Sequence, residues 1–244
     1  MIKVKITLSY DGSKFNGFQI QKNNKKLTTV AGLITKVFKK LNIQTNLVGS
    51  GRTDAGVHAT AQVLHCELPD FWEDLEKLKI KINKMLAPSI YIKSITNVNE
   101  DFHARYGAYK RLYRYVLYSG EYQPFFAPYA LHVKDINTKK LNSILKSFIG
   151  THDFENFKKT GSDTKTDIRH IFKAGAYTYK NMTIIYFLGN SFIRSQVRMM
   201  SDFALKVMNE ELTIEQLEEQ LNKTQKHSTA IIPSCGLYLA KIFY

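Results

Sequence analysis

The segment MIKVKITLSYDG, residues 1–12, alternates apolar and polar side chains at almost every position. Its apolar positions are Ile2, Val4, Ile6, Leu8 and Tyr10. A period of two predicts a β-strand with one buried face, and Asp11-Gly12 supplies the turn chemistry that ends it. The intervening lysines make the segment too polar for a signal peptide or a membrane span. We therefore expect a half-buried strand of a globular sheet here.

Helical and strand patterns follow this strand in turn. Apolar residues on one helical face predict a helix over 30–41, and a second helix over 71–86 is stopped by Pro88. A loop with three glycines occupies 49–56. The strands predicted around it lie near 43–48, 59–67 and 90–97.

The rest of the chain repeats this order of elements. A strand is predicted over 112–118, a hairpin over 168–188 with its turn at Lys180-Asn181, and a closing strand over 236–244. The predicted helices cover 141–148, 192–209 and 213–222. Two such runs indicate an α+β protein with two similar domains, each an antiparallel sheet backed by helices, with the active-site cleft between them. We place the domains at 1–104 and 105–244.

The charge of the chain indicates a polyanionic partner. The 244 residues carry a formal net charge of +14, with a pI near 9.6, which favours a nucleic acid. A lysine-rich solvated surface and an anionic membrane are the alternatives. The two cysteines, Cys66 and Cys235, have no paired spacing, so we expect a reduced, cytoplasmic protein without a metal site.

The loop GSGRTDAG, residues 49–56, is the first candidate for chemistry. Its glycines let the backbone turn tightly and approach a ligand. Arg52 adds a planar cationic donor, and Asp54 adds a nucleophile or base that a nearby arginine would keep ionised. The alternative is a structural turn in which Thr53 or Asp54 caps a backbone N–H group.

Two further segments carry cationic side chains. The run FHARYGAYKRLYRY, residues 102–115, interleaves cations that can neutralise phosphates with aromatic rings that can stack on bases. On a strand, Tyr113 and Tyr115 share one face and Arg114 takes the other, so a buried tyrosine face is the alternative. The run FIRSQVRMM, residues 192–200, predicts a helix with Arg194 and Arg198 one turn apart. Asp202 could instead pair with Arg198.

Taken together, these segments resemble the TruA family of tRNA pseudouridine synthases. GRTDAGVHA, residues 51–59, with Gln62-Val63 is similar to the catalytic motif of the family. The other similar segments occur in the family's order: Tyr10-Asp11-Gly12 with Phe15, Gly17 and 19–21; 102–105 with 111–115; 150–154; and 236–239. The resemblance extends along nearly the whole chain.

The resemblance implies roles for the matched residues. Asp54 would be the catalytic aspartate and Arg52 its neighbour in the motif. Tyr113 would pack on the target base, and Arg198 would pair with the aspartate. Basic side chains expected to bind RNA are Arg105, Lys110, Arg111, Arg114 and Arg194.

Three positions depart from the family pattern. Phe18 stands where tryptophan is usual, Gln196 where methionine is usual, and Asp202 where glycine is usual. A carboxylate at 202 could compete with Asp54 for Arg198, and this leaves room for a related protein with a shifted substrate.

The implied reaction converts uridine to pseudouridine at positions 38, 39 and 40 of the tRNA anticodon arm. It needs no cofactor, and the resemblance implies a homodimer in which one tRNA spans both subunits. The alternatives are a pseudouridine synthase acting on ribosomal or another RNA, and a non-catalytic RNA-binding protein. An unrelated enzyme of small phosphorylated substrates is disfavoured, because the glycine loop has neither the P-loop pattern nor the dinucleotide-binding pattern.

Overall fold

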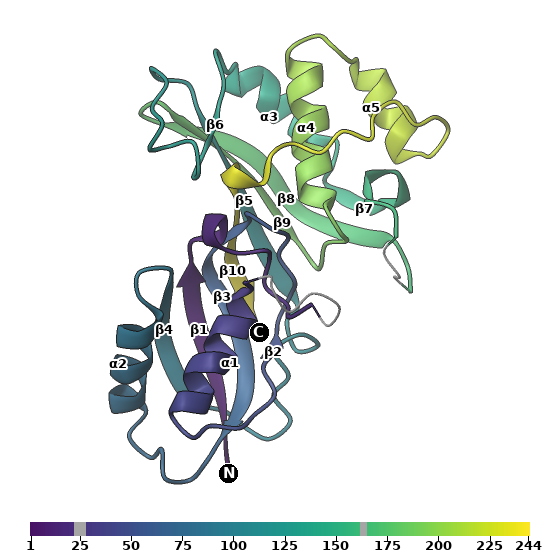
Figure 1. Ribbon diagram of the computed structural model, residues 1–244. Helices are drawn as coiled ribbons and strands as arrows, with labels where there is room; N and C mark the ends of the chain where they lie inside the picture. The colour runs from purple at the N-terminus through teal and green to yellow at the C-terminus, as the bar shows by residue number, and fades with distance from the viewer. Residues whose placement is uncertain (22–27, 162–164) are drawn as a thin grey trace. The chain divides into compact units, whose positions relative to one another are not determined.

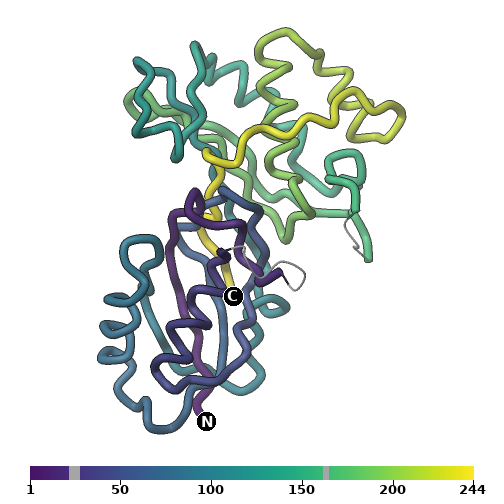
Figure 2. Tube along the Cα trace, in the orientation of Figure 1, coloured from purple at the N-terminus to yellow at the C-terminus, as the bar shows by residue number. Residues whose placement is uncertain are grey.

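The computed structural model describes residues 1–21, 28–161 and 165–244. The chain forms two compact units, Met1–Tyr109 with Tyr238–Tyr244, and Lys110–Leu237. Figure 2 follows the C-terminal segment, in yellow, back into the first unit. The domain boundary expected from the sequence, between 104 and 105, stays a prediction. The boundary between the compact units lies between 109 and 110, and the last seven residues belong to the first unit.

The strands of the first unit lie in the order β4-β1-β3-β10, with β2 also paired to β3. Strand β1 (Ile2–Tyr10) pairs antiparallel with both β3 (His58–Leu68) and β4 (Ile90–Asn97). The closing strand β10 (Leu237–Phe243) instead runs parallel to β3, with Tyr238 opposite His58. The short strand β2 (Val48–Gly49) pairs with the other part of β3.

The alternation read from residues 2–10 sets the core of this unit. Val4, Ile6, Leu8 and Tyr10 are buried, and the residues between them are half-buried. Two helices add to this core, α1 (Val30–Lys40) and α2 (Leu75–Leu86) (Figure 1). Each begins at a side chain that accepts a backbone hydrogen bond, Thr29 for α1 and Asp74 for α2, which satisfies an otherwise unpaired N–H group.

The second unit has a sheet of the order β5-β9-β8-β7. Strands β8 (Ile168–Tyr179) and β9 (Met182–Gly189) form the predicted hairpin, and β9 pairs antiparallel with β5 (Lys110–Tyr118). The remaining strands are β7 (Gly150–Asp153), antiparallel to β8, and β6 (Leu131–His132), parallel to β5. The helices of this unit are α3 (Thr138–Lys146), α4 (Gln196–Met208) and α5 (Ile214–Leu221), with short 3₁₀ turns at Glu155–Phe157 and Ser234–Gly236. A further 3₁₀ turn, Gly12–Lys14, belongs to the first unit.

Aromatic rings fill the core of the second unit. Phe148 meets Phe157 and Phe187 edge to face at centroid distances of 5.7 and 5.9 Å, and Phe157 lies 5.9 Å from Phe203 of α4. Edge-to-face pairs of this kind add to the free energy of burial. Each unit therefore combines a largely antiparallel sheet with helices, and the predicted α+β class is confirmed.

Several predicted elements were wrong in extent. The helix expected over 71–86 begins only at Leu75, and the helix expected over 141–148 is Thr138–Lys146. The strand expected over 43–48 is reduced to β2, Val48–Gly49. The helix expected over 192–209 begins only at Gln196, because Ser195 has a left-handed backbone with φ of 62°, a conformation that does not continue a right-handed helix. Arg194 therefore precedes α4, and the expected spacing of one helical turn between Arg194 and Arg198 does not hold. In the described part of the chain, no helix is long and apolar enough to cross a membrane.

Candidate active site

The loop between β2 and β3 is anchored at both ends. The Ser50 N–H donates to the carbonyl of Val63 at 2.8 Å. At the other end Asp54 opens a turn, with the Val57 N–H donating to its carbonyl at 3.2 Å, and the Gly56 N–H donates to the Phe15 carbonyl at 3.3 Å. The side chain of Asp54 is half-buried and that of Arg52 is exposed. The loop thus holds a carboxylate and an arginine two residues apart on a fixed backbone.

Gln62 holds the first half of this loop from inside the sheet. Its side chain is fully buried, at 0% exposure. Its Nε2 donates to the Gly51 carbonyl at 3.1 Å, while its Oε1 accepts from the Ser50 hydroxyl at 2.7 Å and from the Val63 N–H at 3.1 Å. A buried amide with all these partners fixes the groups it bonds. From the sequence, Gln62 was noted only as part of a motif; the available signal was an amide at a strand position flanked by the apolar Ala61 and Val63.

Thr53, between Arg52 and Asp54, is held by two other groups. The Tyr10 hydroxyl and the Thr53 Oγ1 form a buried hydrogen bond of 2.8 Å. The Phe18 N–H donates to the Thr53 carbonyl at 3.1 Å. Gly17 makes this approach possible, because it has a φ of +94° and a Cβ there would lie 2.8 Å from the Thr53 carbonyl oxygen.

The Phe18 ring explains one departure from the family pattern. The ring is buried and packs so closely on Gly49 that a Cβ at Gly49 would lie 2.4 Å from it. It also lies 6.3 Å from the Tyr10 ring. A phenylalanine at this position therefore keeps the aromatic packing beneath the loop, without the N–H donor of tryptophan.

His58 fixes the start of β3, immediately after the loop. It is 2% exposed, and its Nδ1 accepts from the Gly12 N–H at 3.0 Å. Its ring stacks on Tyr238 of β10, with 4.7 Å between centroids and 18° between planes. His58 thus joins the opening turn and the closing strand of the first unit. No role for His58 was predicted from the sequence.

Strand β5 carries the tyrosine face that its sequence predicts. Tyr113 and Tyr115 are buried, and Arg114 between them is exposed. The Tyr113 ring meets Phe192 edge to face, at 5.1 Å and 77°. Tyr115 donates to the Pro233 carbonyl at 2.7 Å, and burial raises the pKa of its hydroxyl. Phe192 is thus a side chain that sets the orientation of Tyr113, a role the sequence did not reveal.

The expected RNA-binding residues lie in different surroundings. Arg111 is buried and donates to the Asn190 carbonyl at 3.0 Å, whereas Arg114 and Arg194 are exposed. The Lys110 Nζ lies 4.6 Å from the centre of the Phe172 ring, and the Arg105 guanidinium lies 5.7 Å from that of Tyr106. In both pairs the cation is placed against an aromatic face.

Arg198, in the first turn of α4, is half-buried, and its Nε donates to the Ile232 carbonyl at 2.7 Å. Asp202 makes its ion pair with Lys206, one turn further along the helix, at 3.0 Å. The Arg198–Asp202 pair considered from the sequence is replaced by this contact. Gln196 is fully buried, and its Oε1 accepts from the Ile193 N–H at 2.9 Å, which satisfies a donor just before α4.

The expected site residues are divided between the two compact units. Arg52 and Asp54 belong to the first unit, as does Arg105. Tyr113 on β5 and Arg198 on α4 belong to the second. Tyr113 is held by the Phe192 ring and Arg198 by the Ile232 carbonyl, whereas Arg52 and Asp54 are positioned through the backbone of their loop.

Comparison with known proteins agrees with this pattern of residues. The family model described as tRNA pseudouridine synthase matches residues 6–107 and 144–244. The chain is 40% identical to tRNA pseudouridine synthase A of Helicobacter hepaticus, with 98% of both chains covered. It is 37% identical to the protein of the same name from Campylobacter jejuni, with both chains covered in full. The corresponding protein of Limosilactobacillus reuteri is 36% identical, over 100% of this chain and 97% of its own. The chain therefore belongs to the tRNA pseudouridine synthase family.

Proposed function

We propose that this chain converts uridine to pseudouridine at positions 38, 39 and 40 of the tRNA anticodon arm, with Asp54 as the catalytic carboxylate. Membership of the family supports the reaction and the tRNA substrate. The three positions and the role of Asp54 rest on the motif that the chain shares with the TruA family.

The chemistry requires only proton transfers and one exchanged bond at the sugar. The N1–C1′ bond of uridine breaks, the uracil turns, and C5 bonds to C1′. C5 loses a proton and N1 gains one, so the reaction is balanced without a redox cofactor. A carboxylate can serve by attacking C1′ to form a covalent sugar adduct or by removing a proton from C2′.

The observation that carries the assignment of Asp54 is the anchoring of its loop. Gln62, Tyr10 and the Phe18 N–H hold the residues just before Asp54, and the turn to Val57 holds those after it. The carboxylate itself stays half-buried rather than enclosed. A reacting group fixed in this way needs little reorganisation to reach the transition state.

The second unit would supply the contacts to the target base. Tyr113, held by Phe192, would lie against the uracil ring and keep it in place while it is detached. Arg198 would pair with Asp54, and the Asp202–Lys206 ion pair removes the competitor that the sequence suggested. The target uridine must leave its stack first, and we assign Arg52, exposed beside Asp54, to stabilising that flipped state.

The basic side chains would hold the RNA backbone. Arg114 and Arg194 are exposed and can reach phosphates, and Arg105 and Lys110 lie against rings at the surface of their units. Arg111 is buried against the Asn190 carbonyl, and its part in RNA binding stays a prediction. Recognition through phosphates suits an enzyme with three target positions, because such contacts position RNA without reading its sequence.

We also propose a cytoplasmic homodimer, as the family resemblance implies. One face of the second sheet is suited to a partner surface. Leu112 and Val116 of β5 and Ile184, Tyr186 and Leu188 of β9 share the face opposite the buried Phe187, and all are only half-buried. The exposed Arg114 lies on the same face between Leu112 and Val116, and a largely apolar patch with a polar neighbour of this kind commonly marks a protein interface. Sedimentation equilibrium tests this point, and a single species at 28.1 kDa would contradict it.

Tritium release from [5-³H]uridine in an unmodified tRNA transcript tests the function directly. With substrate in excess, wild-type protein is expected to turn over many times, and release is expected to map to positions 38–40. Asp54→Asn, which keeps the size of the side chain, is expected to lose at least about 10³-fold in rate, because the carboxylate performs the chemistry.

The remaining outcomes separate the alternatives. Tritium release from ribosomal RNA and not from tRNA would leave Asp54 as the proposed catalytic residue and change the proposed substrate. Tight tRNA binding by folded wild-type protein without any release would instead indicate a non-catalytic RNA-binding protein.

A further inference from the structure

We propose that the loop 98–107, together with Tyr244, forms a second RNA subsite that takes one unpaired base of the tRNA outside the active site. The inference rests on the proposed function only in taking tRNA as the ligand. Two features within the first unit carry it: an aromatic platform supported by His103, and a hollow on the same loop that His103 also lines.

Tyr106 is the platform. Its side chain is 77% exposed, although it is a large aromatic residue. The Tyr106 ring stacks on the His103 ring, with 4.4 Å between centroids and 29° between planes. The His103 ring is itself fixed, because its Nδ1 accepts from the Arg105 and Tyr106 N–H groups at 3.2 and 3.1 Å. An exposed ring that is supported by a second ring is a surface on which single-stranded bases can stack, and the Arg105 guanidinium, 5.7 Å from the ring centre, adds a cation beside it.

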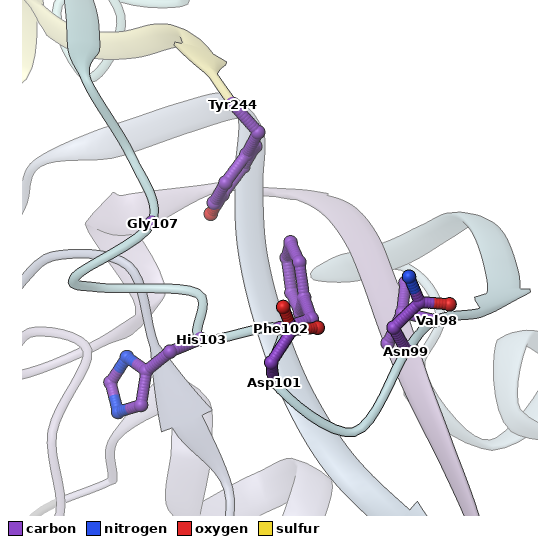
Figure 3. A pocket seen from close by; sticks show the side chains of 7 residues that line it. All are labelled: Val98, Asn99, Asp101, Phe102, His103, Gly107 and Tyr244. Carbon is purple, nitrogen blue, oxygen red and sulfur yellow. The ribbon is translucent and has the colours of Figure 1, made fainter.

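A hollow of about 430 Å³ lies on the same loop. Figure 3 shows the Phe102 and Tyr244 rings that line it, whose centroids are 5.0 Å apart at 47°. The Tyr244 hydroxyl donates to the Ala104 carbonyl at 2.7 Å, so this wall is fixed to the loop. The volume falls in the range of pockets that hold small planar ligands, and aromatic walls suit a nucleobase.

The charges of the hollow favour a base over a phosphate. The Asp101 carboxylate lies next to Phe102 at its edge (Figure 3), and a carboxylate accepts hydrogen bonds but cannot donate them. It would repel a phosphate and accept from the amino or imino groups of a base. Cations lie nearby for the flanking phosphates: the Lys5 Nζ is 6.0 Å from the centre of the Phe102 ring, and Arg105 lies against Tyr106.

The platform loop is attached to β3 at a different point from the segment that carries Asp54. The Asp54 end of the catalytic loop joins β3 at His58, whereas the platform loop is attached at His65, whose Nδ1 accepts from the Ala104 N–H at 3.1 Å. The first residues of the catalytic loop, Gly49 and Ser50, lie beside Leu64 and Val63, so this separation concerns the Asp54 end only. Seven residues of extended strand separate His58 from His65, roughly 23 Å at about 3.3 Å per residue. We therefore assign the platform to a different nucleotide from the one at Asp54, in another part of the tRNA.

Tyr106→Ala tests the inference in the full-length protein. Loss of one stacked base is expected to raise both the Kd and the KM for full-length tRNA by about 5- to 150-fold, with kcat unchanged. Tyr106→Phe keeps the ring and is expected to bind like wild type. Tyr91→Ala is the matched control, because Tyr91 is also an exposed tyrosine of the first unit, at 56% exposure. An isolated anticodon stem-loop is expected to show no difference between Tyr106→Ala and wild type.

Three results would overturn the inference. One is an unchanged Kd for full-length tRNA in Tyr106→Ala. Another is an equal loss on the stem-loop, which would assign Tyr106 to the anticodon arm, and the third is an equal loss in Tyr91→Ala. Because Kd is measured by direct binding, the subsite can be judged even if wild-type protein forms no pseudouridine. Failure of the function and failure of the subsite are therefore distinguishable.

Discussion

At the scale of single residues, the candidate site depends as much on supporting side chains as on Asp54. Asp54 and Arg52 lie on a loop with three glycines, whose backbone has many accessible conformations unless other groups hold it. Tyr10 and Gln62 convert this loop into a fixed structure through buried hydrogen bonds. These two residues position the loop and take no part in the reaction itself, and substitution can distinguish the two roles.

Gln62→Met is expected to lower both stability and turnover. Methionine matches the length of the side chain but leaves the Gly51 carbonyl, the Ser50 hydroxyl and the Val63 N–H without their buried partner. The free energy of unfolding should fall by about 1–3 kcal/mol, and kcat should fall while KM changes little, because the loop no longer holds Asp54 in one position.

Gln220→Met is a matched control for Gln62→Met. Gln220 is also fully buried, and its amide bonds Ser228 and His227 in the second unit. Its loss should lower stability by a similar amount and leave kcat unchanged. Equal effects of the two substitutions on kcat would show that Gln62 acts only through stability.

At the scale of elements, β3 organises the first unit because three of its buried polar side chains each hold a different loop. His58 binds the turn at Gly12, Gln62 binds the catalytic loop, and His65 binds the platform loop at Ala104. A strand in the middle of a sheet is the most constrained part of a domain, so loops attached to it are positioned well. The candidate active site and the proposed second subsite therefore share one scaffold.

The buried His65, which accepts the hydrogen bond from the Ala104 N–H, is expected to make the free energy of unfolding depend on pH. Burial, with smaller contributions from His103 and Lys3, lowers the pKa of His65 from 6.5 to about 4. Between these values the unfolded chain binds a proton that the folded chain does not, so this stability is complete above pH 6.5 and is lost as the pH falls towards 4. From pH 7 to pH 5 the loss should be about 1–2 kcal/mol.

Urea unfolding at the two pH values measures this effect. His65→Gln cannot titrate, and the difference between the two pH values should be smaller in that variant by about the same amount. An identical pH dependence in wild type and His65→Gln would show that other groups cause it.

At the scale of the whole molecule, charge dominates the expected interaction with RNA. A net charge of +14 provides many cations for phosphates, and each phosphate neutralised adds about 0.7–0.9 to the slope of log affinity against log salt. We expect a slope steeper than about −3 for tRNA, reduced by about 0.7–0.9 in Arg114→Gln if this exposed arginine contacts one phosphate. Filter binding between 50 and 200 mM KCl measures both slopes, and an affinity insensitive to salt would contradict the backbone-led mode of binding.

The sequence by itself determined the features that depend on neighbouring residues. Alternation over residues 2–10 and the helical stripe at 30–41 predicted β1 and α1, and the hairpin at 168–188 was predicted with its turn in the right place. The motif around Asp54 indicated the family. These signals survive in sequence because side-chain period and turn chemistry are local properties.

Only the tertiary structure decided the contacts between distant segments. It placed β10 parallel to β3 and put Tyr10 on Thr53. The left-handed backbone of Ser195, after which α4 begins at Gln196, likewise could not be predicted from the helical pattern of the sequence. Hydrogen bonds and ring contacts across 40 or more residues have no period in the sequence, because the partners meet only when strands and helices pack into a common core.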